Sequence, residues 1–574
     1  MYILGINAFH GDSSACLLKD GRVICASEEE RFRRIKHWAG FPSQSIKFCL
    51  EDAGISIDDV DYVTISRNPK ENFSKKVLHT LKNRAGLKYI LDRLMNSKKV
   101  SSVKGQLATI FNVSESDIRA KIHNIEHHRS HIASSFFASK FKKSAILSID
   151  GFGDFTSTMT AIGSDNKIEV LDSVNYPHSL GVFYTTVTQF LGFPNYGDEY
   201  KVMGLAPYGE AKYLKELSSI IEKTADGFFV LNEKYFKHFK EGVAMDWENG
   251  EPTVDSLFTK SWEELFWKSR KKGDTLEQFH IDLATSVQRF TEDLIFYMLT
   301  KLHEKTGLDT ICITGGVAQN SVANGKILAN TPFKNMYVPS AGHDAGTSIG
   351  SALYLYNHIL GKARMPEIKT SYFGRKATEK EIISCLEKER VKYEKVEDDI
   401  LFDRVSTRLK EGGVIGWFQG RAEFGPRALG HRSILVDPSR KDAKDLLNEK
   451  IKRRESFRPF SPSILEEYVK EYFIQNEEVP FMEKVIDIKK EKHSVIPAVT
   501  HFDGTGRLQS VNKEISPRYH RLISEFHKKT GIPILLNTSF NENEPIVNKP
   551  EEALNCFLRT KMDMLVMENI IIER

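Results

Sequence analysis

Two stretches with the same beginning decide the fold: Tyr2-Ile-Leu-Gly-Ile-Asn7 and Ala145-Ile-Leu-Ser-Ile-Asp150. Both contain Ile-Leu-x-Ile followed by Asn or Asp, a pattern typical of a short buried β-strand that ends in a polar residue. A polar, glycine-containing turn follows each stretch, Phe9-His-Gly-Asp-Ser-Ser14 in the first copy and Gly151-Phe-Gly-Asp154 in the second. The repetition predicts that one structural unit occurs twice in the chain.

Each copy continues with two more strand-like runs. In the first copy they lie at 14–18 and 22–27, joined by the hairpin signal Lys19-Asp-Gly21, and in the second they surround Gly163-Ser-Asp-Asn166. We therefore expect a duplicated three-strand meander, with helices after each copy. Duplicated units of this kind, with a polar turn after the first strand, resemble the actin-like (ASKHA, sugar-kinase) type of ATP-binding fold. In that fold the nucleotide lies in the cleft between the two halves.

The C-terminal part of the chain has a separate α/β pattern. Gly361-Lys-Ala-Arg-Met-Pro366 has the composition of a linker. After it, we expect helices near 378–389, 398–411 and 518–530 and strands near 391–395, 413–418 and 532–537. The predicted division is a first domain at 1–360, a linker at 361–376 and an α/β domain at 377–574, which is a common domain size.

Composition excludes several classes of protein. The chain has 574 residues, 40% of them hydrophobic and 28% charged, which is typical of a multidomain globular protein. A net charge of +4 is weak for a nucleic-acid-binding protein, so no nucleic-acid partner is expected. The six cysteines form no C-x-x-C pair, which favours a reducing cytoplasm. Neither a membrane span nor a signal peptide is expected. The sequence is compatible with a homodimer.

Two stretches of biased composition interrupt these patterns. Residues 70–104 are rich in Lys and Arg, and residues 239–265 are rich in acidic residues and Trp. We expect both to be solvated insertions.

Arginines in stiff turns mark a candidate anion pocket. Arg427 follows a Gly-Pro pair, and Arg458 directly precedes a proline. A guanidinium held in one place presents paired donors to a phosphate or carboxylate. Together with Lys452, these residues predict a pocket for a phosphorylated small substrate. The alternative is a set of structural ion pairs with Glu423 and Glu455.

A His-x-x-x-His sequence marks a candidate metal site. His127 and His131 share one face if the segment is helical, a spacing that suits two imidazoles on one metal ion. Asp150 ends a predicted strand, and Asp344 lies in a glycine-containing loop. Two histidines with carboxylates suit Fe(II), Mn(II) or Zn(II). The alternative is a pair of half-buried helix histidines.

The stretch Gly315-Gly-Val-Ala-Gln-Asn320 follows a predicted strand at 310–314. Glycines between a strand and a helix let backbone N–H groups approach a phosphate. Taken alone, a Gly-Gly pair indicates only a tight turn.

Six motifs in order resemble the O-carbamoyltransferase family that modifies antibiotics, toxins and nodulation factors, of which tobramycin O-carbamoyltransferase is a representative. The resemblance covers essentially the whole chain. The motifs are Asp198-Glu-Tyr-Lys-Val-Met-Gly-Leu-Ala-Pro-Tyr-Gly209, Gly315-Gly-Val-Ala-Gln-Asn320, Phe424-Gly-Pro-Arg-Ala-Leu-Gly430, Phe457-Arg-Pro-Phe460, Asp503-Gly-Thr-Gly-Arg507 and Leu536-Asn-Thr-Ser-Phe-Asn541.

The resemblance implies a TsaD-like N-terminal domain and a YrdC-like C-terminal domain. It implies an enzyme that converts carbamoyl phosphate and ATP, with Mg²⁺, to carbamoyl-adenylate and then carbamoylates a hydroxyl of a small natural product. The implied metal is iron, held by His127, His131, Asp150 and Asp344. The residues implied to bind carbamoyl phosphate or nucleotide are Arg427, Lys452, Arg458, Arg507, Asn537, Ser539, Gly315, Gly316 and Asn320.

One departure from the family concerns the base that activates the acceptor hydroxyl. Many members read His-Asp-Ser-Ala in the first turn, whereas this chain has Gly11-Asp-Ser-Ser14 with His10 one position earlier. His10 and Asp12 are therefore the candidate catalytic residues, and a surface role for His10 is the alternative.

Two other functions fit parts of the sequence. A tRNA threonylcarbamoyl-type enzyme would have the same domain types, but it would need a basic surface for tRNA. A non-catalytic, sugar-kinase-like ATP-binding protein would account for the duplicated meander and the glycine pair. It would leave the C-terminal arginines without a role.

Overall fold

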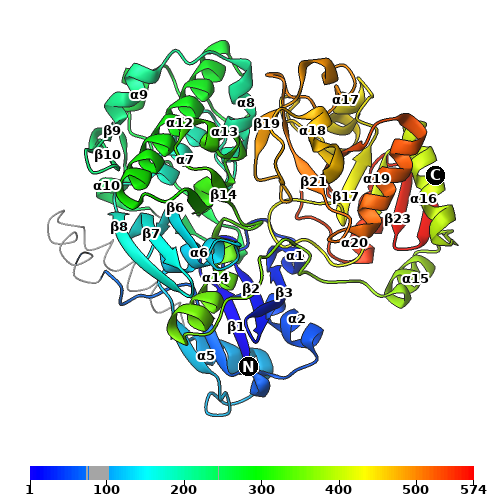
Figure 1. Cartoon of the computed structure of the whole chain (residues 1–574), viewed down its shortest axis with the longest axis horizontal. Coiled ribbons are helices and arrows are strands. Elements are labelled where there is room, and N and C mark those ends of the chain that lie inside the picture. The colour runs from blue at the N-terminus through cyan, green and yellow to red at the C-terminus, as the bar shows by residue number, and fades with distance from the viewer. Residues whose placement is uncertain (73–74, 76–101, 244) are drawn as a thin grey trace. The chain divides into compact units, whose positions relative to one another are not determined.

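The computed structural model describes residues 1–72, 75, 102–243 and 245–574 (Figure 1). Most of the basic stretch 70–104 therefore lies outside the described residues. The chain forms two compact units. Unit 1 comprises Met1–Asn320 and Ile327–Ile368, and unit 2 comprises Ser321–Lys326 and Lys369–Arg574.

Unit 1 contains two five-stranded sheets with the same strand order. The first has the order β3-β2-β1-β4-β5 and the second β8-β7-β6-β13-β14. In each, an antiparallel meander is extended by two parallel strands next to its first strand. The predicted duplication of the meander is confirmed. The strands are β1 Tyr2–Asn7, β2 Ser14–Lys19, β3 Arg22–Glu28, β4 Tyr62–Ile65, β5 Lys121–Asn124, β6 Lys143–Gly153, β7 Thr156–Ser164, β8 Lys167–Asn175, β13 Thr310–Thr314 and β14 Asn335–Tyr337.

Two helices, α6 (His127–Phe136) and α14 (Thr347–Leu353), connect the sheets of unit 1. Helix α6 packs on β6 and β13 of the second sheet, α14 packs on β1 and β4 of the first, and the two helices pack on each other (Figure 1). Each helix follows the last strand of one sheet, so the duplicated halves meet along this pair. Nine of the ten residues of α6 are buried, which explains why it lacks a clear polar face.

A long insertion between β8 and β13 corrects one sequence interpretation. It carries the helices α7 (Leu180–Phe190) and α12 (Gln278–Thr306) and the short helix α11 (Ser261–Leu265). Trp262 of α11 is fully buried, and its Nε1 donates a 2.8 Å hydrogen bond to the carbonyl of Tyr235. The stretch 239–265 is thus partly a hydrophobic anchor and not a wholly solvated insertion. An indole buries a large apolar area once its N–H has a partner.

Unit 2 is built on one mixed eight-stranded sheet in the order β15-β24-β23-β16-β17-β22-β18-β21. Alternate strand residues face opposite sides: Trp417 packs with helices α16 and α19, and Phe418 packs with α15 and α20. The strands are β15 Glu394–Lys395, β16 Ile415–Phe418, β17 Arg432–Val436, β18 Ser461–Leu465, β21 Gln509–Val511, β22 Ile534–Ser539, β23 Met564–Met567 and β24 Ile570–Glu573; the helices are α15 Glu379–Lys388, α16 Asp398–Lys410, α19 Pro517–Thr530 and α20 Pro550–Arg559. The predicted α/β pattern is confirmed within one to three residues at most boundaries.

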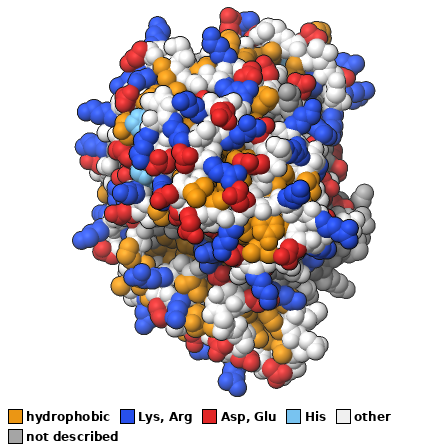
Figure 2. All heavy atoms as spheres, turned by 90° about the vertical axis from the view of Figure 1, so that its right-hand side faces the viewer, with side chains coloured by type: hydrophobic (Ala, Val, Ile, Leu, Met, Phe, Trp, Pro, Cys, Tyr) orange, Lys and Arg blue, Asp and Glu red, His pale blue; other side chains and the backbone are white. Residues whose placement is uncertain are grey.

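The mixed charges on the surface and the unpaired cysteines are the features that the composition predicted. On the face shown in Figure 2, Lys and Arg side chains are interspersed with Asp and Glu side chains. All six cysteines are buried and outside disulfide bonds. Among the described helices, none is both long and apolar enough to cross a membrane.

Candidate functional site

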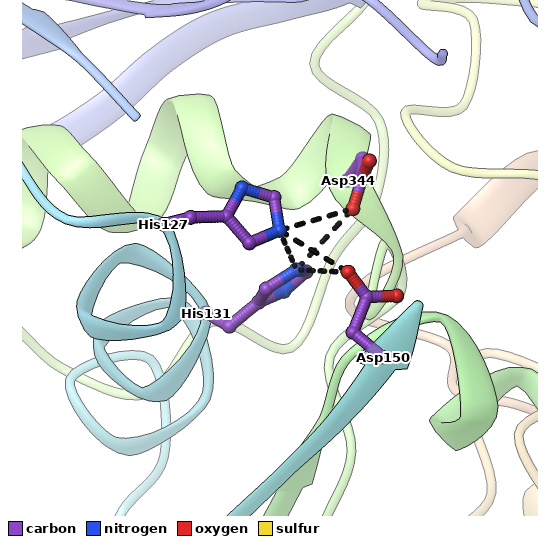
Figure 3. Close-up of side chains that lie close together, drawn as sticks. All are labelled: His127, His131, Asp150 and Asp344. Carbon is purple, nitrogen blue, oxygen red and sulfur yellow. Dashed lines mark hydrogen bonds and ion pairs between the residues drawn. The ribbon is translucent and has the colours of Figure 1, made fainter. Parts of the chain in front are cut away.

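The four predicted metal ligands of unit 1 come together at the junction of its two halves. His127 and His131 lie one turn apart at the start of α6, and Asp150 lies toward the end of β6. Asp344 begins the short helix η6 (Asp344–Gly346) that leads into α14. Figure 3 shows both imidazoles pointing from one helix toward the two carboxylates.

The spacing of the four ligand atoms fits a divalent cation. Nε2 of His127 lies 3.1 Å from Nε2 of His131 and 3.1 Å from Oδ2 of Asp150, and Nε2 of His131 lies 3.3 Å from Oδ1 of Asp344. Ligands bound at about 2.1 Å lie about 3.0 Å apart around an octahedral ion and about 3.4 Å apart around a tetrahedral one. Among described residues, the buried Oδ1 of Asp344 has no hydrogen bond of good geometry. A cation would satisfy it and the two facing nitrogens.

Electrostatics keep both carboxylates ionised despite their burial. Burial opposes the charge of Asp150, but hydrogen bonds from His127 and His131 hold its pKa below the usual range. Burial likewise opposes the charge of Asp344, but His10 and His127 lower its pKa. The same contacts raise the pKa values of His127 and His131, so a divalent ion would displace their protons and meet two carboxylates and two neutral imidazoles.

The residues around α6 hold the two histidine ligands in place. The buried Glu126 side chain caps the helix by accepting hydrogen bonds from the N–H groups of His128 and Arg129. The N–H of His127 donates to Oδ2 of Asp154 at 3.0 Å. His128 faces away from the cluster, where its ring nitrogens contact Ser148 and Thr156. Of the three histidines, the two predicted ligands are those that face the carboxylates.

The two candidate catalytic residues occupy different positions beside this cluster. Nδ1 of His10 lies 2.9 Å from Oδ2 of Asp344, and its ring packs edge-on against His127. Asp12 instead pairs with His37, whose Nδ1 lies 2.8 Å from Oδ1 of Asp12. His37 was not predicted, because no motif or regular spacing connects residues 12 and 37. Only the fold of the chain brings them together.

The glycine loop after β13 joins the metal cluster to a buried polar network. The N–H of Gly316 donates to Oδ1 of Asp150 at 2.9 Å, so the loop orients a predicted metal ligand. The side-chain amides of Asn320 and Gln288 exchange two hydrogen bonds of 3.0 Å. Gln288 also accepts from the hydroxyl of Tyr184, which anchors the loop to α7 and α12.

Gly315 needs glycine for two reasons, and its replacement is a test of the loop. Its backbone has φ 94° and ψ 166°, a region that other residues rarely adopt, and a Cβ atom would lie 2.1 Å from the carbonyl oxygen of Ile149. We expect Gly315→Ala to lower the free energy of unfolding by about 3 kcal/mol or more. Denaturant unfolding followed by tryptophan fluorescence measures the loss.

Gly307→Ala is the matched control. Gly307 also has a positive φ, 64°, but a Cβ atom there would meet nothing within 4 Å. Its loss should be only about 1 kcal/mol. Equal losses for the two variants would show that the contact with Ile149 is unimportant.

Unit 2 holds a cluster of positive charge at the predicted anion pocket. Arg427, Arg458 and Arg507 are half-buried, and Arg454 joins them. Burial lowers the pKa of the Arg507 guanidinium well below its usual value, and the charges of Arg427, Arg454 and Arg458 lower it further. Such crowding of like charge is unfavourable unless an anion balances it. Arg454 was not singled out from the sequence, although it lies in the basic run after Lys452.

The alternative to an anion pocket was a set of structural ion pairs with Glu423 and Glu455. Of these two glutamates, Glu455 pairs with an arginine of the cluster. Oε2 of Glu455 lies 3.6 Å from Arg458, a loose pair. Glu423 accepts hydrogen bonds from the N–H groups of Leu429 and His431 and so shapes the loop that carries Arg427.

Lys452 and Asn537 are more buried in unit 2 than the arginines, whereas Ser539 is half-buried like them. The ammonium of Lys452 is almost fully buried and donates to the backbone and side chain of Asn541 at 2.7 Å and to Ser539. Nδ2 of Asn537 donates to Ser463 and Gln509 inside the sheet. In this structure, Lys452 therefore stabilises the loop after β22, and Asn537 stabilises the adjoining strands.

Comparison with known proteins was informative for both units. Residues 2–353 match the family model described as Carbamoyltransferase N-terminus, and residues 406–574 match Carbamoyltransferase C-terminus. An uncharacterized Synechocystis protein, sll1178, is 39% identical, covering 100% of this chain and 97% of its own.

Several relatives have functional names, and two of them represent different kinds of protein. Nodulation protein NolNO of Sinorhizobium fredii is 38% identical, covering 99% of this chain and 80% of its own. The 3'-hydroxymethylcephem-O-carbamoyltransferase of Amycolatopsis lactamdurans is 32% identical, covering 44% of this chain and 47% of its own.

Proposed function

This chain belongs to the carbamoyltransferase family and is a carbamoyltransferase enzyme, and from that premise we propose that it is an ATP-dependent O-carbamoyltransferase acting on a small-molecule hydroxyl. The observation that supports this most is the crowding of Arg427, Arg454 and Arg458 around Arg507, because a compact, multiply charged anion would offset the repulsion between these cations. In this proposal, unit 1 is TsaD-like with an actin-type fold, and unit 2 is YrdC-like.

Unit 2 would form carbamoyl-adenylate. Water hydrolyses carbamoyl phosphate to carbamate and inorganic phosphate, a carbamate oxygen attacks the α-phosphorus of ATP with its Mg²⁺, and pyrophosphate leaves. Arg427, Arg458 and Arg507 would replace the water lost from these phosphates with fixed donors. Carbamate and carbamoyl-adenylate both decompose in water, so a dry, preorganised pocket also protects them.

Unit 1 would transfer the carbamoyl group. His127, His131, Asp150 and Asp344 would hold a divalent ion such as iron(II), which when bound supplies Lewis-acid polarisation of an oxygen. Asp344 orients His10 through Nδ1. Among described residues, the buried Nε2 of His10 has no hydrogen-bond partner, and it would accept the proton of the attacking hydroxyl. The hydroxyl oxygen bonds to the carbamoyl carbon, and AMP leaves.

The acceptor is proposed to be a natural product in the cytoplasm. The name of the Amycolatopsis relative specifies a hydroxymethyl acceptor, and we propose an alcohol of comparable reactivity here. An alcohol is a weak nucleophile at neutral pH, so it needs the base that His10 would provide.

The test is pyrophosphate release from ATP by purified protein, with and without carbamoyl phosphate and with no acceptor. Release that depends on carbamoyl phosphate is expected. If release is absent both alone and with a 3'-hydroxymethylcephem or tobramycin present, the adenylate mechanism is wrong.

A further inference from the structure

Two turns with strained backbones face each other beside the metal cluster. Phe9 and Asp12 have φ values of 68° and 58°, and His37 has a φ of 54°. Positive φ is uncommon for residues other than glycine, and a histidine or phenylalanine keeps it only where the surroundings enforce it. Phe9 and Asp12 lie on either side of His10 in the chain, and His37 pairs with Asp12. The unusual backbone conformations therefore surround His10, the proposed proton acceptor, whose position matters for the reaction.

Hydrogen bonds join the two turns along their length. The N–H of Phe9 donates to the carbonyl of Gly40 at 2.9 Å, and the hydroxyl of Ser13 donates to the same oxygen at 2.8 Å. The N–H of Asp12 donates to the carbonyl of His37 at 3.3 Å. In addition, Oδ1 of Asp12 lies 2.8 Å from Nδ1 of His37. His10 is thus held on both sides by residues that bind the 37–40 turn.

His37 is itself fixed by neighbours from two other elements. Its N–H donates to Oε2 of Glu30 at 2.8 Å. The His37 ring packs edge-on against Tyr196. Gly197 has no side chain, and this leaves the space that the Nε2 edge of the His37 ring occupies. The phenol of Tyr196 lies over Gly11, next to His10 in the first turn. The imidazole therefore lies between the short helix α1 (Glu30–Arg33), the first turn and the 195–198 loop.

We propose that the Asp12–His37 pair is a latch that holds His10 against Asp344, which makes His37 a positioning residue for the transfer step. His37 acts through Asp12 and the first turn and does not itself touch the reacting atoms. The expected effect of this pair on activity rests on the proposed function of unit 1. The latch also has a physical consequence that is measurable without any acceptor.

The charge of His37 makes the latch sensitive to pH. Burial opposes protonation of His37, but the carboxylates of Asp12 and Glu30 outweigh it and raise its pKa to about 9, with Lys36 acting in the opposite direction. Glu199 and the ring of Tyr196 also face it. Because the folded pKa is raised, the ion pair is complete below the usual pKa of a histidine, near 6.5, and is lost as pH rises through about 9.

The experiment measures carbamoyl transfer to a 3'-hydroxymethylcephem and to tobramycin between pH 6 and pH 10.5. For the wild type, kcat should fall as pH rises through about 9, with little change in KM. His37→Asn keeps a donor near the Nδ1 position and tolerates positive φ, but it does not titrate. Its kcat should stay near the lower value that the wild type reaches above pH 9, with no alkaline limb. His37→Ala should lower kcat about 10- to 100-fold at pH 7, as for other residues that orient a catalytic histidine or ligand, and the difference from the wild type should shrink above pH 9, where the wild type has lost the ion pair.

Asp12→Asn keeps the proposal falsifiable if His37→Ala does not fold. It removes the ion pair but keeps a hydrogen-bond acceptor for Nδ1 of His37, so kcat at pH 7 should fall toward the value that the wild type reaches above pH 9, and the alkaline limb near pH 9 should disappear. Pyrophosphate release, expected of unit 2, should be unchanged in all three variants. An alkaline limb that persists unchanged in His37→Asn, or wild-type kcat in His37→Ala, would overturn the latch.

A second measurement separates failure of the latch from failure of the proposed function. With ¹³C-labelled histidine, the His37 resonance should titrate near pH 9, and the His10 resonance should shift with it. Variants His37→Asn and His10→Asn assign the two signals. Coupled shifts without any carbamoyl transfer would support the latch and reject the transferase mechanism. A His10 signal that is indifferent to His37 would reject the latch whatever the activity.

Discussion

Arg458→Ala is expected to reduce carbamoyl-phosphate-dependent pyrophosphate release by at least about 10²- to 10³-fold, the range for removing one preorganised donor from a charged transition state. Arg458 is one of the three cations that crowd Arg507, so its loss should weaken the binding of every phosphate placed there. The measurement is the initial rate of pyrophosphate release at saturating ATP. Metal binding by unit 1 should be unchanged, since His127, His131, Asp150 and Asp344 all lie in unit 1.

Arg453→Ala is the matched control for this prediction. Arg453 lies in the same segment, but 64% of its side chain is exposed and it pairs with Glu542 at 3.3 Å. An exposed pair of this kind contributes little to stability, and pyrophosphate release should stay near the wild-type rate. Equal effects of the two substitutions would indicate a general loss of positive charge. Normal release in Arg458→Ala would contradict the pocket itself.

His131→Ala is expected to lose the metal and carbamoyl transfer while keeping pyrophosphate release. Nε2 of His131 lies within 3.5 Å of both carboxylates and faces Nε2 of His127, so its removal leaves three ligands and a cavity. We expect the affinity for Fe(II), or Co(II) as a spectroscopic probe, to fall more than about 100-fold, beyond the range for residues that only orient a ligand. Calorimetric titration and metal analysis measure this.

His128→Asn tests whether the effect is specific to the cluster. His128 is on the same helix and equally buried, and burial lowers its pKa to about 3, so it is neutral. Its replacement should cost about 1–3 kcal/mol of stability through its lost hydrogen bonds, but metal affinity should be retained. Wild-type transfer by His131→Ala would show that the metal cluster has no part in the reaction.

Much of the fold could be predicted because its signals are local. The alternation and apolar character of β1, β2, β6 and β7 are visible in short windows, and so are the turns that join them. The buried Trp262 was misjudged for the opposite reason. Acidic neighbours in a short window predict exposure to solvent. Two aromatic partners that bury this indole, Phe190 and Phe236, are distant in sequence.

The candidate metal site was predictable in part. The helical spacing of His127 and His131 is a local pattern, and their common face follows from the geometry of a helix. Asp150 and Asp344 were expected to join them, but the distances between all four atoms depend on the packing of α6, α14 and the strand β6. Similarly, Arg454 and the burial of Lys452 could not be read from composition, since neighbours in a basic run point in different directions.

By itself, the sequence determined the duplicated meander and the α/β character of the C-terminal part, and it predicted residues that could bind a cation or an anion. These depend on periodicity, turn chemistry and the side chains themselves. Only the tertiary structure decided that His10 pairs with Asp344 and that Asp12 pairs with His37. The physical reason is that such pairs form when distant segments pack and close a loop, and no feature of either segment alone encodes the partner it will meet.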